Sequence, residues 1–223
     1  MHIRTEDIQI DWGWVDSELC TIERIPPSIR ISVDGCIKEA VSLAKPKIVS
    51  TVKKIVNIRP DAIEIDGSMI FSGKQLSAYI KGAECLHIFL VTIGSGIEDS
   101  ASMWMSRGES LYGYLLDRIG SLAVESLAET IEKRLRSICA SNGEGVSMRL
   151  SPGYCDWPIE EQFTLAKLLD FSGAGVHLTE KCMMVPRKSI SAVVGIGPED
   201  IFTKSKSQCV VCDKADCDYR RRG

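Results

Sequence analysis

Two short stretches of the chain hold residue types that could do chemistry. The first is R-L-S-P-G-Y at residues 149–154, where Pro-Gly is a typical turn dipeptide. A turn of this kind exposes backbone N–H and C=O groups beside the guanidinium of Arg149 and the phenol of Tyr154. The planar guanidinium suits a carboxylate, because its fork can bind both oxygens at once. The turn therefore predicts a site for a small carboxylate ligand, and an ordinary structural turn is the alternative.

The second stretch is rich in cysteine. Cys209, Cys212 and Cys217 have the spacing C-x2-C-x4-C, and three thiolates so placed can bind one metal ion or cluster. A fourth ligand would have to come from elsewhere, and Cys155 and Cys182 are the candidate donors. The stretch predicts an iron–sulfur cluster or zinc. Three reduced, unliganded thiols at a frayed end are the alternative.

The composition limits the class of protein. The chain has 223 residues, 44% of them hydrophobic, and a net charge of −3, so a core can form and nothing points to nucleic acid. No apolar run is long enough for a membrane span, and the N-terminus lacks the apolar core of a signal peptide. We expect a cytoplasmic protein with one domain over residues 1–202, followed by a cysteine-containing tail at 203–223.

The pattern of apolar residues predicts the elements that would position these stretches. Residues 1–30 look irregular, and strands and helices do not alternate regularly in the rest of the chain. The expected helices are 32–43, 75–81, 111–139 and one from about 157 to 171; the expected strands are 48–58, 62–65, 68–71, 85–92, 146–150, 176–178 and 190–196. Hairpins without regular alternation favour an α+β fold with a largely antiparallel sheet.

Some single residues carry local predictions. Gly120 lies inside the longest helix, where glycine costs about 1 kcal/mol, so close packing against another backbone is expected there. Asp156 is placed to cap the helix that follows it. Lys188, Ser189 and Ser191 are interpreted either as an exposed polar edge or as a return segment near the ligand turn.

The region from residue 149 to residue 191 resembles the activation domain of cobalamin-dependent methionine synthase. A weaker likeness extends upstream, so that residues 80–197 are covered well. The matching residues are Arg149-x-Ser151-Pro152-Gly153-Tyr154, Trp157-Pro158, Gln162, Gly175-Val176, Leu178-Thr179-Glu180, Met183-Met184, Pro186, Lys188-Ser189-x-Ser191, Val91-Thr92-Ile93-Gly94 and Asp117-x-Ile119-Gly120-Ser121-x-Ala123-Val124-Glu125. The resemblance implies a curved, mainly antiparallel sheet with flanking helices, in a short free-standing form of the domain.

The same resemblance implies a site for S-adenosylmethionine. Arg149 would hold the ligand's carboxylate, Ser151 would offer backbone contacts, Tyr154 a side-chain contact and Glu125 a charge contact. Glu144 is a candidate for a further acidic contact. Asp11 stands where the large enzyme has another, but its surroundings fit poorly and we interpret that match as a coincidence.

The resemblance further implies a module that reactivates oxidised cobalamin, with no catalytic residue of its own. The chain lacks the Asp-x-His-x-x-Gly corrinoid motif, so the cobalamin would be carried by a partner, a methionine synthase or another corrinoid protein. The electron would come from a donor such as flavodoxin or ferredoxin. Two alternatives stay open: an iron–sulfur electron-transfer protein for corrinoid activation, and a non-catalytic interaction subunit of a corrinoid enzyme.

Overall fold

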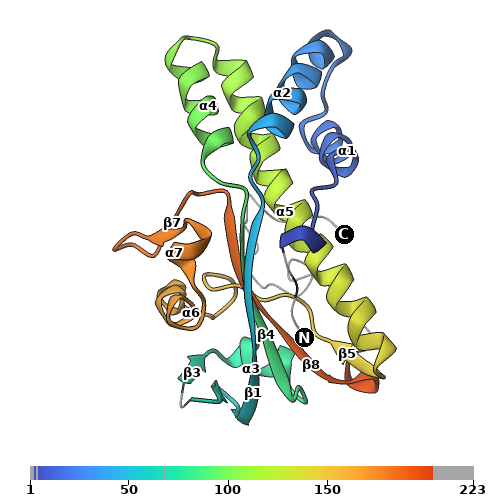
Figure 1. Ribbon diagram of the computed structural model, residues 1–223, viewed down its shortest axis with the longest axis vertical. Coiled ribbons are helices and arrows are strands. Elements are labelled where there is room, and N and C mark those ends of the chain that lie inside the picture. The colour runs from blue at the N-terminus through green and yellow to red at the C-terminus, as the bar shows by residue number, and fades with distance from the viewer. Residues whose placement is uncertain (1–2, 4, 68, 203–223) are drawn as a thin grey trace.

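A six-stranded antiparallel sheet forms the centre of the molecule (Figure 1), in a computed structural model that describes residues 3, 5–67 and 69–202. The strand order is β3-β2-β1-β4-β8-β5, and every neighbouring pair is antiparallel. The strands are β1 Lys47–Arg59, β2 Ala62–Ile65, β3 Met69–Ser72, β4 Cys85–Thr92, β5 Glu144–Val146 and β8 Ser189–Pro198. The predicted α+β class with a mainly antiparallel sheet is confirmed.

The sheet is buried on both faces at its centre. Seven of the eight residues of β4 are buried, and because side chains alternate along a strand, they feed two separate cores. Phe89 and Val91 pack with the long helices, whereas Leu86, Ile88 and Leu90 pack on the opposite face. A strand that is buried on both faces needs apolar side chains at successive positions, and β4 has them.

Long helices cover the first face of the sheet. They are α1 Trp12–Glu23, α2 Arg30–Leu43, α4 Gly96–Ser106 and α5 Ser110–Ser141. Helix α5 has 32 residues, about 48 Å at the usual helical rise, and runs the length of the molecule beside the sheet (Figure 1). It therefore links the helical end of the molecule to the end where β5 and β8 pair.

Short elements cover the second face. They are α3 Lys74–Ile80, α6 Gln162–Leu168, α7 Phe171–Ala174 and the small hairpin of β6 His177–Leu178 with β7 Met184–Val185. Single 3₁₀ turns complete the described chain: η1 Thr5–Asp7, η2 Pro27–Ile29, η3 Ile159–Glu161 and η4 Glu199–Ile201. The expected single helix after Asp156 is thus wrong, because the chain breaks at Leu169, which has extended backbone dihedrals.

The expectation that residues 1–30 are irregular is also wrong. Helix α1 begins after Asp11, whose carboxylate accepts a hydrogen bond from the backbone N–H of Trp14 at 2.9 Å. Asp at this position satisfies a free N–H of the first turn. Only Val15 and Leu19 of α1 are fully buried, and two buried positions make a weak periodic signal.

The glycine in the middle of α5 is explained by side chains, not by a backbone as expected. A Cβ on Gly120 would lie 2.9 Å from Cγ2 of Ile97 and 3.3 Å from Cε of Lys188. The close backbone approach occurs two turns earlier, where a Cβ on Gly113 would lie 2.7 Å from the carbonyl oxygen of Ala101. Helices α4 and α5 therefore touch most closely near their common turn.

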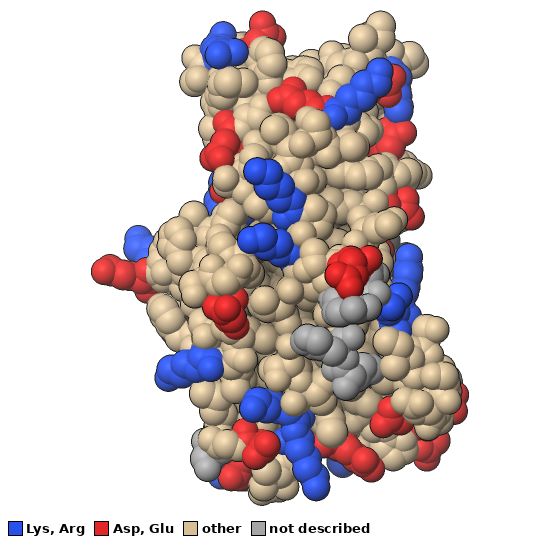
Figure 2. Space-filling model, in the orientation of Figure 1, with Lys and Arg blue, Asp and Glu red and all other residues tan. Residues whose placement is uncertain are grey.

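The surface facing the viewer carries charges of both signs. Figure 2 shows Lys and Arg scattered among Asp and Glu on this face, without a single-sign field, which gives no electrostatic footprint for nucleic acid on this face. Of the helices that the structure describes, none combines the length and the apolar character that crossing a membrane requires.

Candidate functional site: a guanidinium between two carboxylates

Arg149 lies in the extended segment between β5 and the Pro-Gly turn. The next residue, Leu150, forms an antiparallel bridge with Val193 of β8, with backbone hydrogen bonds of 3.0 and 2.8 Å. On the helix side, Arg136 of α5 donates to the carbonyl oxygens of Val146 and Ser147 at 3.4 and 3.3 Å. The segment is thus fixed between β8 and α5, and Arg149 meets the face of α5.

Two carboxylates of α5 bind the guanidinium of Arg149. Its Nη2 lies 2.7 Å from Oε2 of Glu125, and its Nε lies 3.2 Å from Oε1 of Glu132. Glu125 and Glu132 are seven residues apart, which is two helical turns, so both project from one face. The structure therefore brings together Arg149 and Glu125, which the sequence analysis had placed in one site.

The third nitrogen of the guanidinium, Nη1, forms no hydrogen bond with either carboxylate. Nη1 of Arg149 is enclosed and has no hydrogen-bond partner within the described part of the chain. The whole side chain is only 16% exposed. A buried donor without a partner costs about 1–3 kcal/mol, more for a charged group, so this atom is a ready position for an acceptor.

Burial and charge act against each other in this cluster. Burial by itself would lower the pKa of Arg149, but the carboxylates of Glu125 and Glu132 outweigh it, and the pKa of Arg149 is raised. Burial raises the pKa of Glu132, while the charges of Arg149 and Arg136 act in the opposite direction. Arg149 is therefore cationic at any relevant pH, and Glu132 is the member whose charge is most easily lost.

The Pro-Gly turn is held by its own backbone and by a distant helix. Gly153 has φ +87°, the left-handed region that favours glycine, and its N–H donates to the carbonyl oxygen of Trp157 at 2.8 Å. Asp156 does not cap the helix that follows it. It accepts from the backbone N–H groups of Lys74 and Gln75 at 2.6 and 3.1 Å, and so attaches the turn to the start of α3.

The two remaining predicted residues belong to this turn. The carbonyl oxygen of Ser151 accepts from the N–H of Tyr154 at 3.3 Å, and Ser151 is buried at 9% exposure, whereas Tyr154 is 45% exposed. The phenol of Tyr154 is close enough to Arg149 to influence its pKa. The described structure thus places Arg149, Glu125 and Tyr154 in one neighbourhood, with Ser151 two residues beyond Arg149.

Two further residues lie near the cluster, and sequence reasoning missed one of them, Glu132. Glu132 gave no signal apart from its two-turn spacing from Glu125. Asp11 was set aside as a coincidence, but its backbone N–H donates to Oγ of Ser126 at 2.9 Å. Because Ser126 follows Glu125, this bond brings Asp11 beside the cluster on α5. Its carboxylate is engaged in the cap of α1.

The return segment after β7 is buried, so the expectation of an exposed polar edge is wrong. Lys188, Ser189 and Ser191 are exposed by 6% or less. Nζ of Lys188 lies 2.8 Å from Oδ1 of Asp117 and 2.9 Å from Oγ of Ser121, in the space that Gly120 leaves open. Oγ of Ser191 donates to Oε1 of Gln162 at 2.7 Å. These residues attach β8 to α5 and α6.

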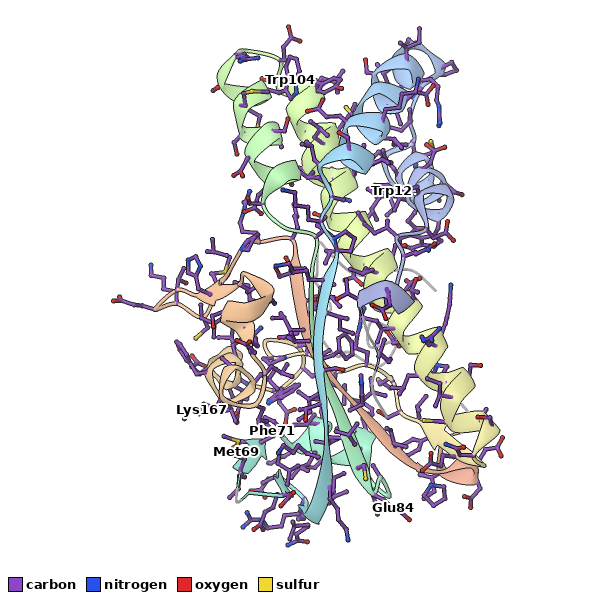
Figure 3. All side chains as sticks on the ribbon, viewed as in Figure 1. Trp12, Met69, Phe71, Glu84, Trp104 and Lys167 are labelled. Carbon is purple, nitrogen blue, oxygen red and sulfur yellow. The ribbon has the colours of Figure 1, made fainter. Side chains whose placement is uncertain are left out.

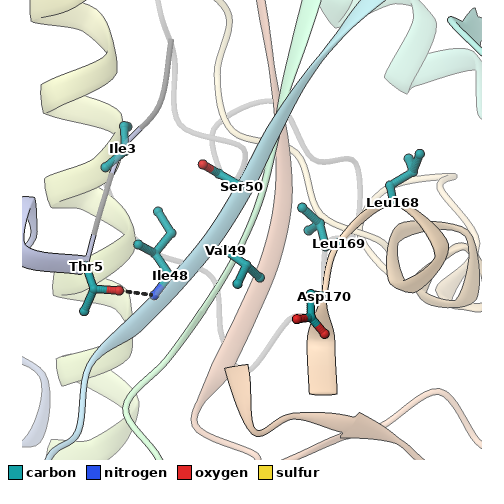
Figure 4. A pocket seen from close by; sticks show the side chains of 8 residues that line it. All are labelled: Ile3, Thr5, Ile48, Val49, Ser50, Leu168, Leu169 and Asp170. Carbon is teal, nitrogen blue, oxygen red and sulfur yellow. Dashed lines mark hydrogen bonds between the residues drawn. The ribbon is translucent and has the colours of Figure 1, made fainter. Parts of the chain in front are cut away.

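Two cavities of the described structure lie away from this cluster. One of about 400 Å³ follows the edge of β1 (Figure 4), between the N-terminal segment and the connection from α6 to α7; its lining is Ile3, Thr5, Ile48, Val49, Ser50, Leu168, Leu169 and Asp170. A second, of about 200 Å³, is lined in part by Tyr79, Met148 and Phe202. Neither includes Arg149, Glu125 or Tyr154, so the evidence for the candidate site is the charge cluster and not a preformed hollow.

The predicted metal ligands Cys209, Cys212 and Cys217 lie outside the described residues. Of the two candidate donors for a fourth ligand, Cys155 is exposed and Cys182 is buried. Within residues 3, 5–67 and 69–202 no three His, Cys, Asp or Glu side chains are grouped to hold a metal ion.

Together, the curved sheet, the long helix beside it and the guanidinium between two carboxylates define an α+β domain with a partly buried charge cluster. Residues 74–208 match the family described as "Vitamin B12 dependent methionine synthase, activation domain", and the chain belongs to this family.

A solved structure agrees with that assignment at the level of the fold. It is the crystal structure of the MetH reactivation domain bound to AdoHcy, with a TM-score of 0.60 and 19% identity over 89% of this chain and 76% of the other. No curated protein matches the chain significantly.

Proposed function

We propose that this chain binds S-adenosylmethionine at Arg149 and supports the reductive methylation of cobalamin carried by a separate protein. The observation that supports it is the enclosed, unpartnered Nη1 of Arg149 between two carboxylates, beside a turn that resembles the ligand turn of the family. A MetH reactivation domain with this fold was crystallised with AdoHcy, the product that S-adenosylmethionine leaves after methyl transfer.

The charges of the cluster complement those of the ligand. S-adenosylmethionine carries a carboxylate, an ammonium and a sulfonium. The carboxylate would bind Arg149 through charge-assisted hydrogen bonds, and Glu125 would accept from the ammonium. One guanidinium with two carboxylates has an excess negative charge, which suits a ligand with one net positive charge.

The turn supplies the remaining contacts of this proposal. The backbone of Ser151 and the phenol of Tyr154 would contact the ligand, and the cap by Asp156 would keep the turn in place. Asp11, which lies beside Ser126, is a further carboxylate within the neighbourhood. Glu144 lies in β5, in register with Pro198 of β8, and we assign it no ligand contact in this proposal.

The chain's own residues bind and orient, and they supply no general base or nucleophile. S-adenosylmethionine supplies the methyl group, and the cobalamin of the partner accepts it together with one electron. The partner would be a cobalamin-binding methionine synthase or another corrinoid protein, and the electron donor a flavodoxin or ferredoxin, all in the cytoplasm. Holding the two reactants in line is a sufficient contribution, because orientation alone accounts for large rate effects.

Calorimetric titration with S-adenosylmethionine tests the proposal. We expect the wild type to bind, and Arg149→Ala to weaken binding by about tenfold or more, which corresponds to about 1.4 kcal/mol. Arg59→Ala is the matched control, because Arg59 is an exposed guanidinium at the end of β1.

Absence of binding by anaerobically prepared wild type would overturn the proposal and favour a non-catalytic interaction subunit. Equal effects of Arg149→Ala and Arg59→Ala would remove Arg149 from the site. The alternative of an iron–sulfur electron-transfer protein stays a prediction about the cysteine tail, and a colourless anaerobic preparation without bound iron would contradict it.

A further inference from the structure

Two carboxylates contact the same edge of the Arg149 guanidinium and leave its other end for a ligand. An arginine has five N–H donors: one on Nε and two on each Nη. Nε and Nη2 form one edge of the plane, and this edge is taken by Glu132 and Glu125 respectively. The end formed by Nη1 and the outer N–H of Nη2 remains, and Nη1 has no partner among the described residues.

The contact between Glu132 and Nε of Arg149 determines how Glu125 can bind the same guanidinium. An isolated Arg–carboxylate pair prefers two parallel hydrogen bonds, so Glu125 alone would bind both Nε and Nη2. That pair would use both oxygens of Glu125 and turn the end of the fork away from its present direction. Because Glu132 contacts Nε, Glu125 meets the guanidinium at Nη2.

Stability alone does not explain why two carboxylates contact Arg149. Two carboxylates share one guanidinium, and burial raises the pKa of Glu132 although the charges of Arg149 and Arg136 act in the opposite direction. Partly buried ion pairs add little to stability in general. A positioning role explains why a costly second carboxylate stands beside an already paired arginine.

We propose that Glu132 is a positioning residue, which holds the Nε edge of Arg149 so that the Nη1 end faces the carboxylate of the bound amino acid. Glu132 does not touch the ligand. It acts through Arg149, whose Nη1 it keeps directed at the ligand's carboxylate. This inference rests on the proposed function, because the ligand it orients is S-adenosylmethionine.

Two probes separate positioning from general loosening of the site. S-adenosylmethionine has the carboxylate that Arg149 would bind, and decarboxylated S-adenosylmethionine keeps the ammonium and the sulfonium but lacks it. We expect Glu132→Ala to lower the preference for S-adenosylmethionine over the decarboxylated probe by about fivefold to tenfold, as expected for a lost charge-assisted hydrogen bond. Glu132→Gln, which keeps the volume and an acceptor oxygen, should retain part of the preference.

The effect should depend on Arg149. In the Arg149→Ala background, Glu132→Ala should change the preference by less than about twofold, because residues that act through one another are not additive. Glu109→Gln is the control for charge, since Glu109 is exposed at the far end of α5, and it should leave the preference unchanged. Thermal unfolding of each variant checks that the fold is retained.

Each outcome has a distinct meaning. A wild type that does not bind S-adenosylmethionine overturns the proposed function, and this inference with it. A wild type that binds, with an unchanged preference in Glu132→Ala and Glu132→Gln, overturns only the positioning role. A full effect of Glu132→Ala in the Arg149→Ala background would show that Glu132 contacts the ligand itself, and would also overturn it.

Discussion

Helix α5 takes part in two partly buried polar clusters, one at its start and one around its middle, and they differ in whether their hydrogen bonds are complete. Near its start, Tyr112 of α5 helps to surround the carboxylate of Glu39. Near its C-terminal half, Glu125 and Glu132 surround the guanidinium of Arg149. We call the first cluster closed, because both oxygens of Glu39 accept hydrogen bonds. We call the second open, because Nη1 of Arg149 has no partner among the described residues.

The closed cluster joins three helices. Oε1 of Glu39 accepts from Oγ of Ser100 and from Nε1 of Trp104, the latter at 3.2 Å, and Oε2 accepts from the hydroxyl of Tyr112 at 3.0 Å. Trp104 lies at the helical end of the molecule (Figure 3), with its ring centroid 4.9 Å from that of Tyr112. Burial and the hydrogen bond to Glu39 raise the pKa of Tyr112, so all three donors stay neutral.

The comparison shows how to tell a structural cluster from a candidate site. In the closed cluster one charge is matched by neutral donors from α4 and α5, which fixes helix packing and offers nothing to a ligand. In the open cluster one guanidinium contacts two carboxylates, and its buried Nη1 has no partner among the described residues. Incomplete satisfaction of a buried charge is a cost to the fold, and the binding function that we propose would account for it.

The largest expected effect is on stability at the closed cluster. Glu39→Ala leaves three donors without their acceptor and should lower the free energy of unfolding by about 3 kcal/mol, as measured by urea denaturation. Glu39→Gln keeps one acceptor oxygen and should cost clearly less. Affinity for S-adenosylmethionine should change by less than about twofold, and a large loss of affinity would contradict the division between the clusters.

The open cluster should behave in the opposite way. The triple variant Glu125→Gln, Glu132→Gln, Arg149→Met replaces all three charges with groups of similar size, and such replacements are often neutral for stability. We expect the free energy of unfolding to stay within about 1 kcal/mol of the wild type, while calorimetry detects no binding of S-adenosylmethionine. A loss of stability as large as that of Glu39→Ala would mean that this cluster is structural too.

The smallest effect is a pH dependence from Glu132. Because its pKa is raised in the folded protein, the stability it contributes is present below the unfolded pKa of about 4.3 and is lost as the pH rises through the folded pKa. The stability of the wild type relative to Glu132→Gln should therefore fall as the pH rises above about 4.3. Chemical denaturation of both proteins across this range measures it, and a constant difference would show that the pKa of Glu132 is not raised.

Local patterns were sufficient for much of the fold. The apolar run of β4, the stripe of α5 and the Asp66-Gly67 hairpin each predict their element, because hydrophobic period and turn chemistry act over a few residues. Helix α1 was missed because it buries little, and the helix after Asp156 was drawn too long because an extended residue interrupts a continuous pattern.

For the site, the sequence by itself predicted the Pro-Gly turn and Arg149 as ligand contacts, and its residues carried the likeness to the activation domain of cobalamin-dependent methionine synthase. Only the tertiary structure decided that Glu132 shares the guanidinium with Glu125, that Asp156 caps a helix 82 residues earlier in the chain, and that Lys188 is buried against Asp117. These contacts join residues far apart in sequence or two turns apart on one helix. Residue type alone does not reveal which charge meets which, because the packing of α5 against the sheet sets the distance.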